Sequence, residues 1–244
     1  MLRICVLSLG LMVTGSAMAD WSATAEAGLV IATGNTETET ANAKLALANE
    51  VGAWKHSFGA SALYASSDAQ GTTAQRWEVL GQSDYNFSPR NFAFGSVRYE
   101  DDEFSGFEYQ ASAAVGLGHK FIESERTNFS GTAGVGYKFY ETRDVFDEAT
   151  GALLDPGESD SEVILRGTLD LDHRLTDTTS LIDRFIVEAG ADNTFLQNDL
   201  SLQVKMTDVL ALAVGYSVRH NTDPPLSFEK TDTLTTINLV YELK

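Results

Sequence analysis

Apolar and polar residues alternate with a period of two along most of the chain. In the stretch EYQASAAVGLGHKF, one set of alternate positions includes Tyr109, Leu117 and Phe121, while the other includes Gln110 and Lys120. The stretches NFSGTAGVGYKFY, VILRGTLDLDHRL and DLSLQVKM repeat this alternation, which is typical of β-strands with one apolar and one polar face. Runs of this kind predict about twelve strands. They lie near residues 21–33, 38–49, 55–65, 74–87, 92–100, 108–121, 127–140, 163–175, 180–189, 198–206, 209–220 and 232–243.

The connections between the predicted strands alternate in length. Short turns fall near residues 51–54, 88–91, 122–126, 176–179 and 207–208. Longer loops fall near residues 66–73, 101–107, 141–162, 190–197 and 221–231, and a tight hairpin is expected at Gly34 and Asn35. Short turns at one end and long loops at the other are typical of bacterial outer-membrane barrels. The pattern therefore predicts an all-β fold, a transmembrane up-and-down antiparallel β-barrel of about 12 strands.

Side-chain size indicates which face of the strands meets lipid. The apolar positions carry many alanines, such as Ala41 and Ala113, and a twelve-stranded barrel is too wide for such small side chains to fill. Aromatic residues near the ends of the same positions predict the two interfacial girdles of a membrane barrel. They are Phe58 and Tyr64, Trp77 and Tyr85, Tyr109 and Phe121, and Phe129 and Phe139. From Tyr109 to Phe121 a tilted strand crosses roughly 30 Å, which matches the apolar band of a bilayer.

The charged residues test this assignment, because a basic residue on the lipid face at mid-depth costs roughly 2–4 kcal/mol. Ten basic residues fall on the polar positions, and the others of the mature chain lie in turns, loops or the C-terminus. Acidic residues share the same inward face, so we expect ion pairs inside the barrel. The predicted lumen charge network consists of Arg76, Glu78, Arg98, Glu100, Lys138, Arg166, Asp170, Arg184, Glu188, Lys205 and Arg219.

The N-terminal sequence MLRICVLSLGLMVTGSAMAD has the pattern of a secretory signal peptide. Arg3 precedes an apolar run, and Ala17 and Ala19 are the small residues before the expected cleavage site. The predicted domains are a signal peptide at residues 1–19 and an outer-membrane β-barrel at residues 20–244. Cys5 is the chain's one cysteine and lies in the segment to be removed, so no disulfide is expected in the exported protein.

Net charge limits the expected partners. The formal charge is −18, with the acidic excess mainly in the loops, so nucleic acid is not expected as a partner. The strongly acidic loop at residues 141–162 is expected to be mobile and solvated. No later segment has eighteen apolar residues in a row, which argues against a transmembrane helix. We expect contacts with outer-membrane lipid, lipopolysaccharide and the barrel-assembly machinery, a monomeric state and no cofactor.

Five distinctive stretches extend over nearly the whole mature chain: TGNTETETANAKL, RYEDDEFSGFEYQASAAVGLGHKF, EAGADNTF, VGYSVRHNTDPP and EKTDTLTTINLVYEL. Together they resemble a known family of salt-induced outer-membrane proteins (YdiY-like), a domain of unknown function. The resemblance implies a monomeric outer-membrane β-barrel and supplies no catalytic mechanism. One departure is the C-terminus, where Tyr241 and Leu243 alternate as an assembly signal should but the chain ends in Lys244 rather than an aromatic residue.

The stretch RYEDDEFSGFEYQ contains the highest density of candidate functional residues. Arg98 and Glu100 are expected inside the lumen, with the following residues in an outer loop. The loop carboxylates are either solvated or oxygen ligands for Ca²⁺ or Mg²⁺, although they lack the alternate-residue spacing of a dedicated calcium loop. A carboxylate acid/base pair is a third reading. The candidate cation-binding residues are Asp101, Asp102, Glu103 and Glu108.

Three classes of function fit these observations. The favoured hypothesis is a non-enzymatic outer-membrane barrel, either a narrow cation-favouring pore or an envelope-structural protein, linked to salt or osmotic stress through the family resemblance. A soluble periplasmic carbohydrate-binding β-protein is the first alternative, and the alternation of turn and loop lengths argues against it. An outer-membrane lipid hydrolase is the second. It requires an outward Ser–His pair, and the outward histidines lack an evident serine partner in the sequence.

Overall fold

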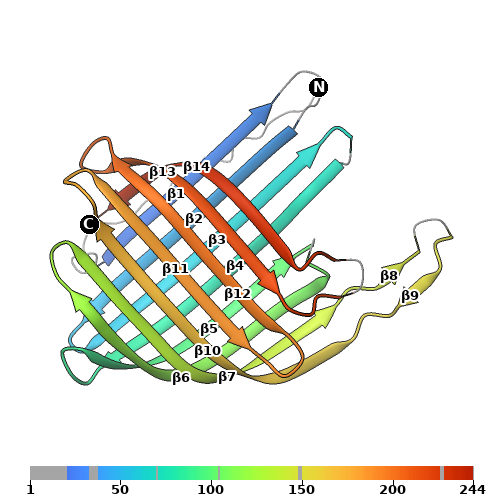
Figure 1. The fold of residues 1–244 in the computed structure, drawn as a ribbon, viewed down its shortest axis with the longest axis horizontal. Helices are drawn as coiled ribbons and strands as arrows, with labels where there is room; N and C mark the ends of the chain where they lie inside the picture. Colours follow the sequence, from blue (N-terminus) through green and yellow to red (C-terminus); the bar gives the residue numbers. More distant parts are fainter. Residues whose placement is uncertain are drawn as a thin grey trace.

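The computed structural model describes residues 21–32, 38–69, 71–103, 105–147, 150–225 and 228–243. Within these ranges, twelve strands form a closed antiparallel barrel in the ring order β1, β14, β13, β12, β11, β10, β7, β6, β5, β4, β3, β2 (Figure 1). Among the described residues there is no helix long and apolar enough to cross a membrane. The expected signal peptide at residues 1–19, with Cys5, and the Gly34 and Asn35 hairpin lie outside the described residues.

The barrel strands follow the predicted ranges closely, and the prediction of a twelve-stranded up-and-down β-barrel is confirmed. Each strand pairs with its neighbours in antiparallel register, so alternate side chains point into the lumen and out of the barrel. The strands are β1 (Trp21–Ala32), β2 (Thr38–Val51), β3 (Trp54–Ser67), β4 (Gly71–Asn86), β5 (Asn91–Asp102), β6 (Phe107–Glu123), β7 (Thr127–Thr142), β10 (Ser159–Arg174), β11 (Thr179–Ala189), β12 (Thr194–Lys205), β13 (Leu210–Asn221) and β14 (Thr231–Leu243).

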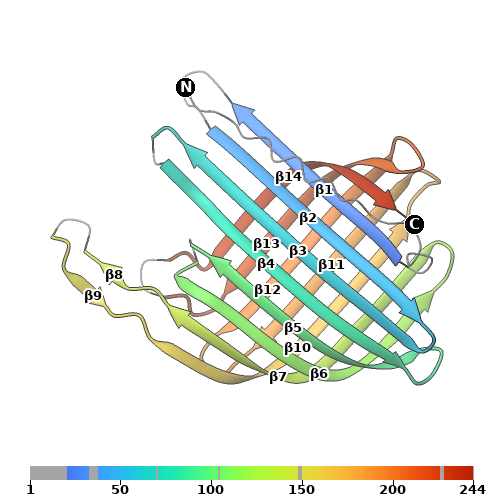
Figure 2. The ribbon, with the colours of Figure 1, turned by 180° about the vertical axis from the view of Figure 1, so that it is seen from behind.

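The long acidic segment after β7 contains more regular structure than the sequence indicated. A short antiparallel ribbon, β8 (Val145–Phe146) and β9 (Leu153–Asp155), projects beyond the barrel in Figures 1 and 2. β7 also continues to Thr142 and β10 begins at Ser159. The outer loop expected over residues 141–162 is therefore shorter than predicted and contains a ribbon, because cross-strand backbone pairing continues past the apolar stretches on which its bounds were based.

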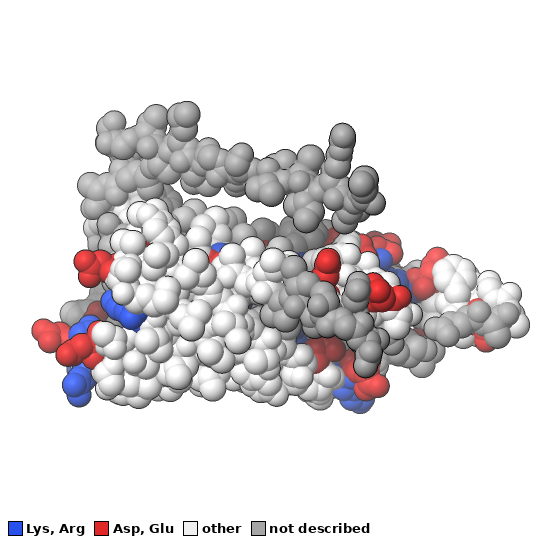
Figure 3. Space-filling view, turned by 90° about the horizontal axis from the view of Figure 1, so that it is seen from above, with Lys and Arg blue, Asp and Glu red and all other residues white. Residues whose placement is uncertain are grey.

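The outer surface of the barrel has an apolar belt bordered by aromatic rings. Near the long loops, Tyr99 stacks on Trp77 and Tyr109, with ring centroids 5.1 and 5.9 Å away. Near the short turns, the rings of Phe121 and Phe129 lie 5.0 Å apart. Figure 3 shows charged side chains gathered at the two ends and an uncharged zone between them. This arrangement suits a bilayer, with two interfacial girdles around a hydrocarbon-facing surface.

Aromatic side chains also point inward at the short-turn end of the lumen. Phe92 and Phe94 are buried, and their cross-strand partners on β6 are Gly118 and Gly116. A Cβ atom on Gly118 would collide with the Phe92 ring, so the glycine makes room for the ring. The small residues on the polar face of β6 are thus explained by rings from β5 that lie over them. This part of the lumen is filled by packed side chains.

Candidate functional site: a charge bridge across the lumen

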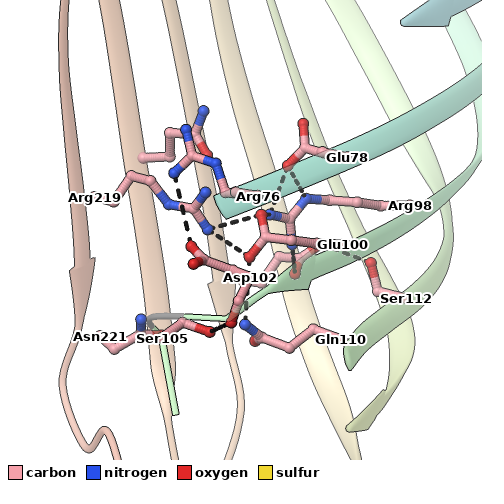
Figure 4. A network of polar contacts seen from close by, with 12 residues as sticks. Arg76, Glu78, Arg98, Glu100, Asp102, Ser105, Gln110, Ser112, Arg219 and Asn221 are labelled. Carbon is pink, nitrogen blue, oxygen red and sulfur yellow. Dashed lines mark hydrogen bonds and ion pairs between the residues drawn. The ribbon is translucent and has the colours of Figure 1, made fainter. Parts of the chain in front are cut away.

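Two strands on opposite sides of the barrel are joined by charged side chains. Arg219 on β13 donates from Nη2 to both carboxylate oxygens of Glu100 on β5, at 2.6 and 2.7 Å. In the ring order, five strands separate β5 from β13 in either direction. Arg98, two residues before Glu100 on the same inward face, contacts Glu100 at 2.6 Å and Glu78 of β4 at 2.7 Å (Figure 4). The contact therefore crosses the full width of the lumen.

A second carboxylate extends these contacts toward β10 and β11. Glu188 on β11 accepts hydrogen bonds from Arg166 of β10 at 2.5 Å and from Ser112 of β6 at 2.8 Å. Its other oxygen lies 3.8 Å from the guanidinium of Arg98. We call the connected group the lumen bridge. It consists of Glu78, Arg98, Glu100, Arg166, Glu188 and Arg219.

All residues of the lumen bridge except Glu78 are almost completely shielded from solvent. Glu100 and Glu188 are each 1% exposed, Arg166 is 3% exposed, and Arg98 is 6% exposed. Phe195 of β12 is fully buried beneath the network, with the guanidinium carbons of Arg98 and Arg219 at 4.7 and 5.1 Å from its ring centroid. At this depth, side chains occupy the space between β5 and the opposite strands, so water has no wide path there.

The charges of the lumen bridge balance. Three guanidinium groups face three carboxylates, and both central carboxylates contact more than one arginine. Charges removed from water cost several kcal/mol each unless they are paired and hydrogen-bonded. Removal of a single partner would leave an uncompensated buried charge. The bridge is therefore an all-or-none arrangement that fixes the opposite walls of the barrel to each other.

The other residues of the predicted charge network lie outside this group. Arg76 lies 3.9 Å from Asp102 toward the outer mouth. Asp170 and Arg184, 3.3 Å apart and both well exposed, form a separate pair with Asp172 nearer the short turns. Lys205 is exposed at the end of β12, and Lys138 is buried without an ion pair to any described residue. The sequence identified the inward face, whereas the barrel's cross-section decides which inward charges meet.

The candidate cation-binding residues do not converge. Arg143 lies 3.8 Å from Asp101 and 3.1 Å from Glu108, while Glu103 accepts a hydrogen bond from Gln75 at 2.5 Å. Asp102 points toward Arg76 instead. Among the described residues, no group of three or more acidic, histidine or cysteine side chains is arranged to hold a metal ion. The hypothesis of a shared cation site is therefore not supported by the geometry, because each carboxylate has a partner within the protein.

Sequence reasoning missed Phe195, on which the two arginines stack. The strand was expected to begin at residue 198, but β12 begins at Thr194, so Phe195 was assigned to a loop. A signal was available, because Phe195 alternates in phase with Gln197 and Asp199, which share the inward face. The cation–π contacts themselves depend on β5 and β13 lying opposite, which alternation along one strand does not reveal.

The expectation that the outward histidines lack a serine partner was wrong. His56 Nδ1 lies 2.9 Å from Ser83 Oγ on the next strand, so an outward histidine does have a serine partner. Ser83 lies in the paired interior of β4, where backbone N–H groups are used by the sheet and cannot form an oxyanion hole. His119 and His173 contact Asn91 and Thr127 of adjacent strands in a similar way. These contacts are typical of polar cross-strand pairs near a membrane boundary.

The opposite side of the lumen is less filled. Lys44 and Ala46 on β2 share the inward face of Asn42, whose amide donates to Asn238 of β14 at 3.0 Å, yet both are exposed. The register places Lys44 between Glu26 of β1 and Ser61 of β3. The inward face of β2 therefore carries small and polar side chains that solvent reaches at Lys44 and Ala46.

Comparison with protein families identifies the chain. Residues 25–243 match the family described as "Protein of unknown function, DUF481". The chain belongs to this family. A DUF481 assignment agrees with the YdiY-like resemblance drawn from the sequence, and that prediction is confirmed. The chain is 24% identical over 226 residues to "Uncharacterized protein YdiY" of Escherichia coli (strain K12), covering 89% of this chain and 81% of YdiY.

Solved structures resemble this DUF481 protein in fold. The translocator domain of the autotransporter NalP from Neisseria meningitidis has a TM-score of 0.53 at 11% identity, covering 96% of this chain and 91% of that chain. The NanC porin has a TM-score of 0.49 at 9% identity, covering 91% of this chain and 99% of that chain. The likeness to the NalP domain shows the fold alone, which is that of an outer-membrane β-barrel.

Proposed function

We propose that this barrel is a non-enzymatic outer-membrane protein that forms a narrow, cation-favouring pore. The observation that carries the proposal is the buried contact between Glu100 and Arg219, which joins opposite walls and occupies the middle of the lumen. A barrel of twelve strands without such a contact has room for a wide aqueous channel. The bridge reduces the open part of the lumen to the side lined by β1, β2 and β3.

Charge at the outer mouth supports a preference for cations. The outer loops carry an excess of carboxylates, among them Glu141, Asp144 and Glu158, with Arg143 as a cation among them. Carboxylates around a narrow mouth raise the local concentration of cations, with a range of about 8 Å at physiological salt. Lys44 on the open side of the lumen opposes that preference locally, and Glu26 beside it offsets the effect.

Conductance of the refolded protein in a planar bilayer tests the pore. We expect small single-channel steps in the native protein and larger steps in a Glu100→Ala/Arg219→Ala variant, because both sides of the central contact are then removed. Glu125→Gln, in an exposed periplasmic turn, serves as the matched control and should conduct as the native protein does. A large, stable open pore in the native protein would contradict the constriction. Identical conductance steps in all three proteins would show that the lumen bridge does not limit the conductance.

Ion selectivity is tested separately, by the reversal potential in a KCl gradient. A positive preference for K⁺ over Cl⁻ that falls when Asp144 and Glu158 are changed to Asn and Gln supports the role of the loops. Should the native protein not conduct at all, the remaining proposal is an envelope-structural role. A deletion strain then loses resistance to NaCl or to osmotic shock, the stress that the family resemblance suggests. A strain with unchanged growth under both conditions would contradict that link.

The proposal includes a route to the membrane and a set of partners. We propose export through cleavage after residue 19, assembly by the barrel-assembly machinery, and a monomer in contact with lipopolysaccharide. The regular outward alternation of Ile237, Leu239 and Tyr241 on β14 supports recognition by that machinery. N-terminal sequencing of protein from outer-membrane fractions, with heated and unheated gels, tests these points. A soluble periplasmic protein that does not change mobility on heating would contradict them.

A further inference from the structure

The outer mouth contains a lysine that lacks a polar partner. Lys138 on β7 is 2% exposed and makes no hydrogen bond or ion pair with any described residue. Its ammonium nitrogen lies 5.8 Å from the ring centroid of Phe107 and 5.6 Å from that of Tyr140. Ring faces attract a cation, but they do not replace the oxygen acceptors that an ammonium group loses on burial. Because Lys138 also lines a pocket, an acceptor from outside the chain can reach this ammonium group.

Two acceptors beside Lys138 also lack donors. Within the described residues, Glu162 Oε1 and Gln110 Oε1 are buried and receive no hydrogen bond. Glu162 is the direct cross-strand neighbour of Lys138, and Gln110 is the neighbour of Tyr140. Buried polar atoms in native proteins are nearly all paired, with protein, water or ligand. Lys138, Glu162 and Gln110 therefore form a polar cluster on adjacent strands whose hydrogen bonds within the chain are incomplete.

A pocket of about 180 Å³ reaches this cluster at Lys138, whereas Glu162 and Gln110 are not part of its wall. Its wall includes Lys138, Tyr140, Asp192 and Asp223, and Pro225 closes it from the loop between β13 and β14. Pockets for drug-sized ligands are usually about 300–1,000 Å³, so this one admits only a small molecule. It lies above the lumen bridge, and its formation does not depend on whether the barrel conducts ions.

The pocket wall carries both a lysine and two aspartates, and this combination restricts which class of ligand can bind. An anion would contact Lys138 but would also face Asp192 and Asp223, while a metal cation would face the Lys138 ammonium. A hydroxyl group accepts a hydrogen bond from an ammonium and donates one to a carboxylate at the same time. We infer that this pocket binds a small uncharged polyol of the size of a single sugar ring. Neighbouring hydroxyls contact Lys138 and the acidic side chains, and the C–H face packs against Tyr140 and Pro225.

Calorimetric titration of the refolded full chain tests the site, with glycerol and a panel of uncharged hexoses as probes. At least one probe should give saturable binding, while inorganic phosphate and MgCl₂ should not compete with it. Lys138→Met keeps the length of the side chain and removes the donor, so binding should weaken about tenfold or more. Lys205→Met, which changes an exposed inward-facing lysine at the other end of the barrel, is the matched control and should bind as the native protein does.

Each other outcome overturns the inference. No saturable binding of any probe to the native protein would mean that water alone fills the cluster. Phosphate that binds in place of a polyol would make this an anion site. Equal binding by Lys138→Met and Lys205→Met would place the ligand elsewhere. If Lys138→Met does not assemble into a heat-modifiable barrel, an Asp192→Asn/Asp223→Asn variant replaces it, because both residues lie outside the strands, and undiminished binding by that variant would overturn the site.

Discussion

Glu100 and Arg219 meet across the barrel at 2.6 Å, although 119 positions separate them along the chain and five strands separate them around the ring in either direction. Because both side chains are buried, the contact holds opposite walls together. Barrel closure alone fixes each strand to its two neighbours. This pair adds a constraint on the cross-section, and it is the feature from which the proposed narrow lumen follows.

Removal of one partner from this pair should destabilise the barrel. Arg219→Met leaves Glu100 buried with Arg98 as its remaining cation, and we expect the free energy of unfolding to fall by about 3 kcal/mol. A Glu100→Leu/Arg219→Met variant should lose less than the sum of the two single variants, with a coupling of about 1–3 kcal/mol. Denaturant titration in lipid vesicles measures all three. Additive losses would show that the pair contributes no coupling energy.

The close packing of Phe92 on Gly118 predicts a position-specific effect of alanine. Gly118→Ala should lower the free energy of unfolding by about 1–3 kcal/mol, because the new methyl group forces the Phe92 ring to move. Gly95→Ala on β5 is the matched control, since a Cβ there meets nothing within 4 Å. The same denaturant titration measures both. A larger loss for Gly95→Ala would mean that backbone freedom, and not ring packing, explains the glycines.

The lipid-facing surface of β11 and β12 carries a hydrogen-bonded polar pair. Asn198 on β12 donates to Asp183 on β11 at 2.7 Å. The inward contacts of Arg184 and Phe195 show that the alternate positions, Asp183 and Asn198, point out of the barrel. Cross-strand register places Asp183 midway between an aromatic residue near the short turns and one nearer the outer mouth. The series of neighbours is Phe129, Leu171, Asp183, Leu200 and Tyr216.

At mid-depth this pair should limit stability. An Asp183→Leu/Asn198→Leu variant should be more stable than the native barrel by about 1 kcal/mol, because it removes polar groups from hydrocarbon. Asp183→Lys should be less stable by about 2–4 kcal/mol, the cost of a basic residue at the bilayer midplane. Unfolding titrations in vesicles give both values. A destabilised double-leucine variant would show that the pair is needed, through contact with a partner or through its own hydrogen bond.

The paired carboxylates of the outer loop predict a weak response to divalent cations at that loop. Asp101→Asn/Glu108→Gln should leave the change in heat stability on adding millimolar Mg²⁺ unaltered, because both carboxylates already pair with Arg143. The variant should instead loosen the loop, since Arg143 also donates to the Phe107 carbonyl at 3.0 Å. Limited proteolysis of the β8 and β9 ribbon reports the loosening. Loss of the Mg²⁺ response in this variant would restore the cation-binding hypothesis.

Local patterning determined most of the fold. The period of two defined the strands because successive side chains of a strand must point to opposite faces, and lipid accepts only one class of side chain. The aromatic ends and the inward basic residues gave the orientation for the same reason. The predicted strand at residues 198–206 began late because Phe195 and Gln197 precede its clear alternation, while β7 and β10 were longer because backbone pairing continues into polar sequence.

The contacts of the candidate site required the tertiary structure. The sequence placed Arg98, Glu100 and Arg219 on the inward face. Alternation, however, places on that face both the charges that contact one another and the charges that do not. Whether Glu100 contacts Arg219 depends on the ring order, strand tilt and cross-section of the closed barrel, which bring residues together without any local signal. The separation of Arg184 from the lumen bridge and the isolation of Lys138 follow from the same geometry. Alternation decides whether a side chain points into or out of the barrel, and only closure of the barrel decides which residues it contacts.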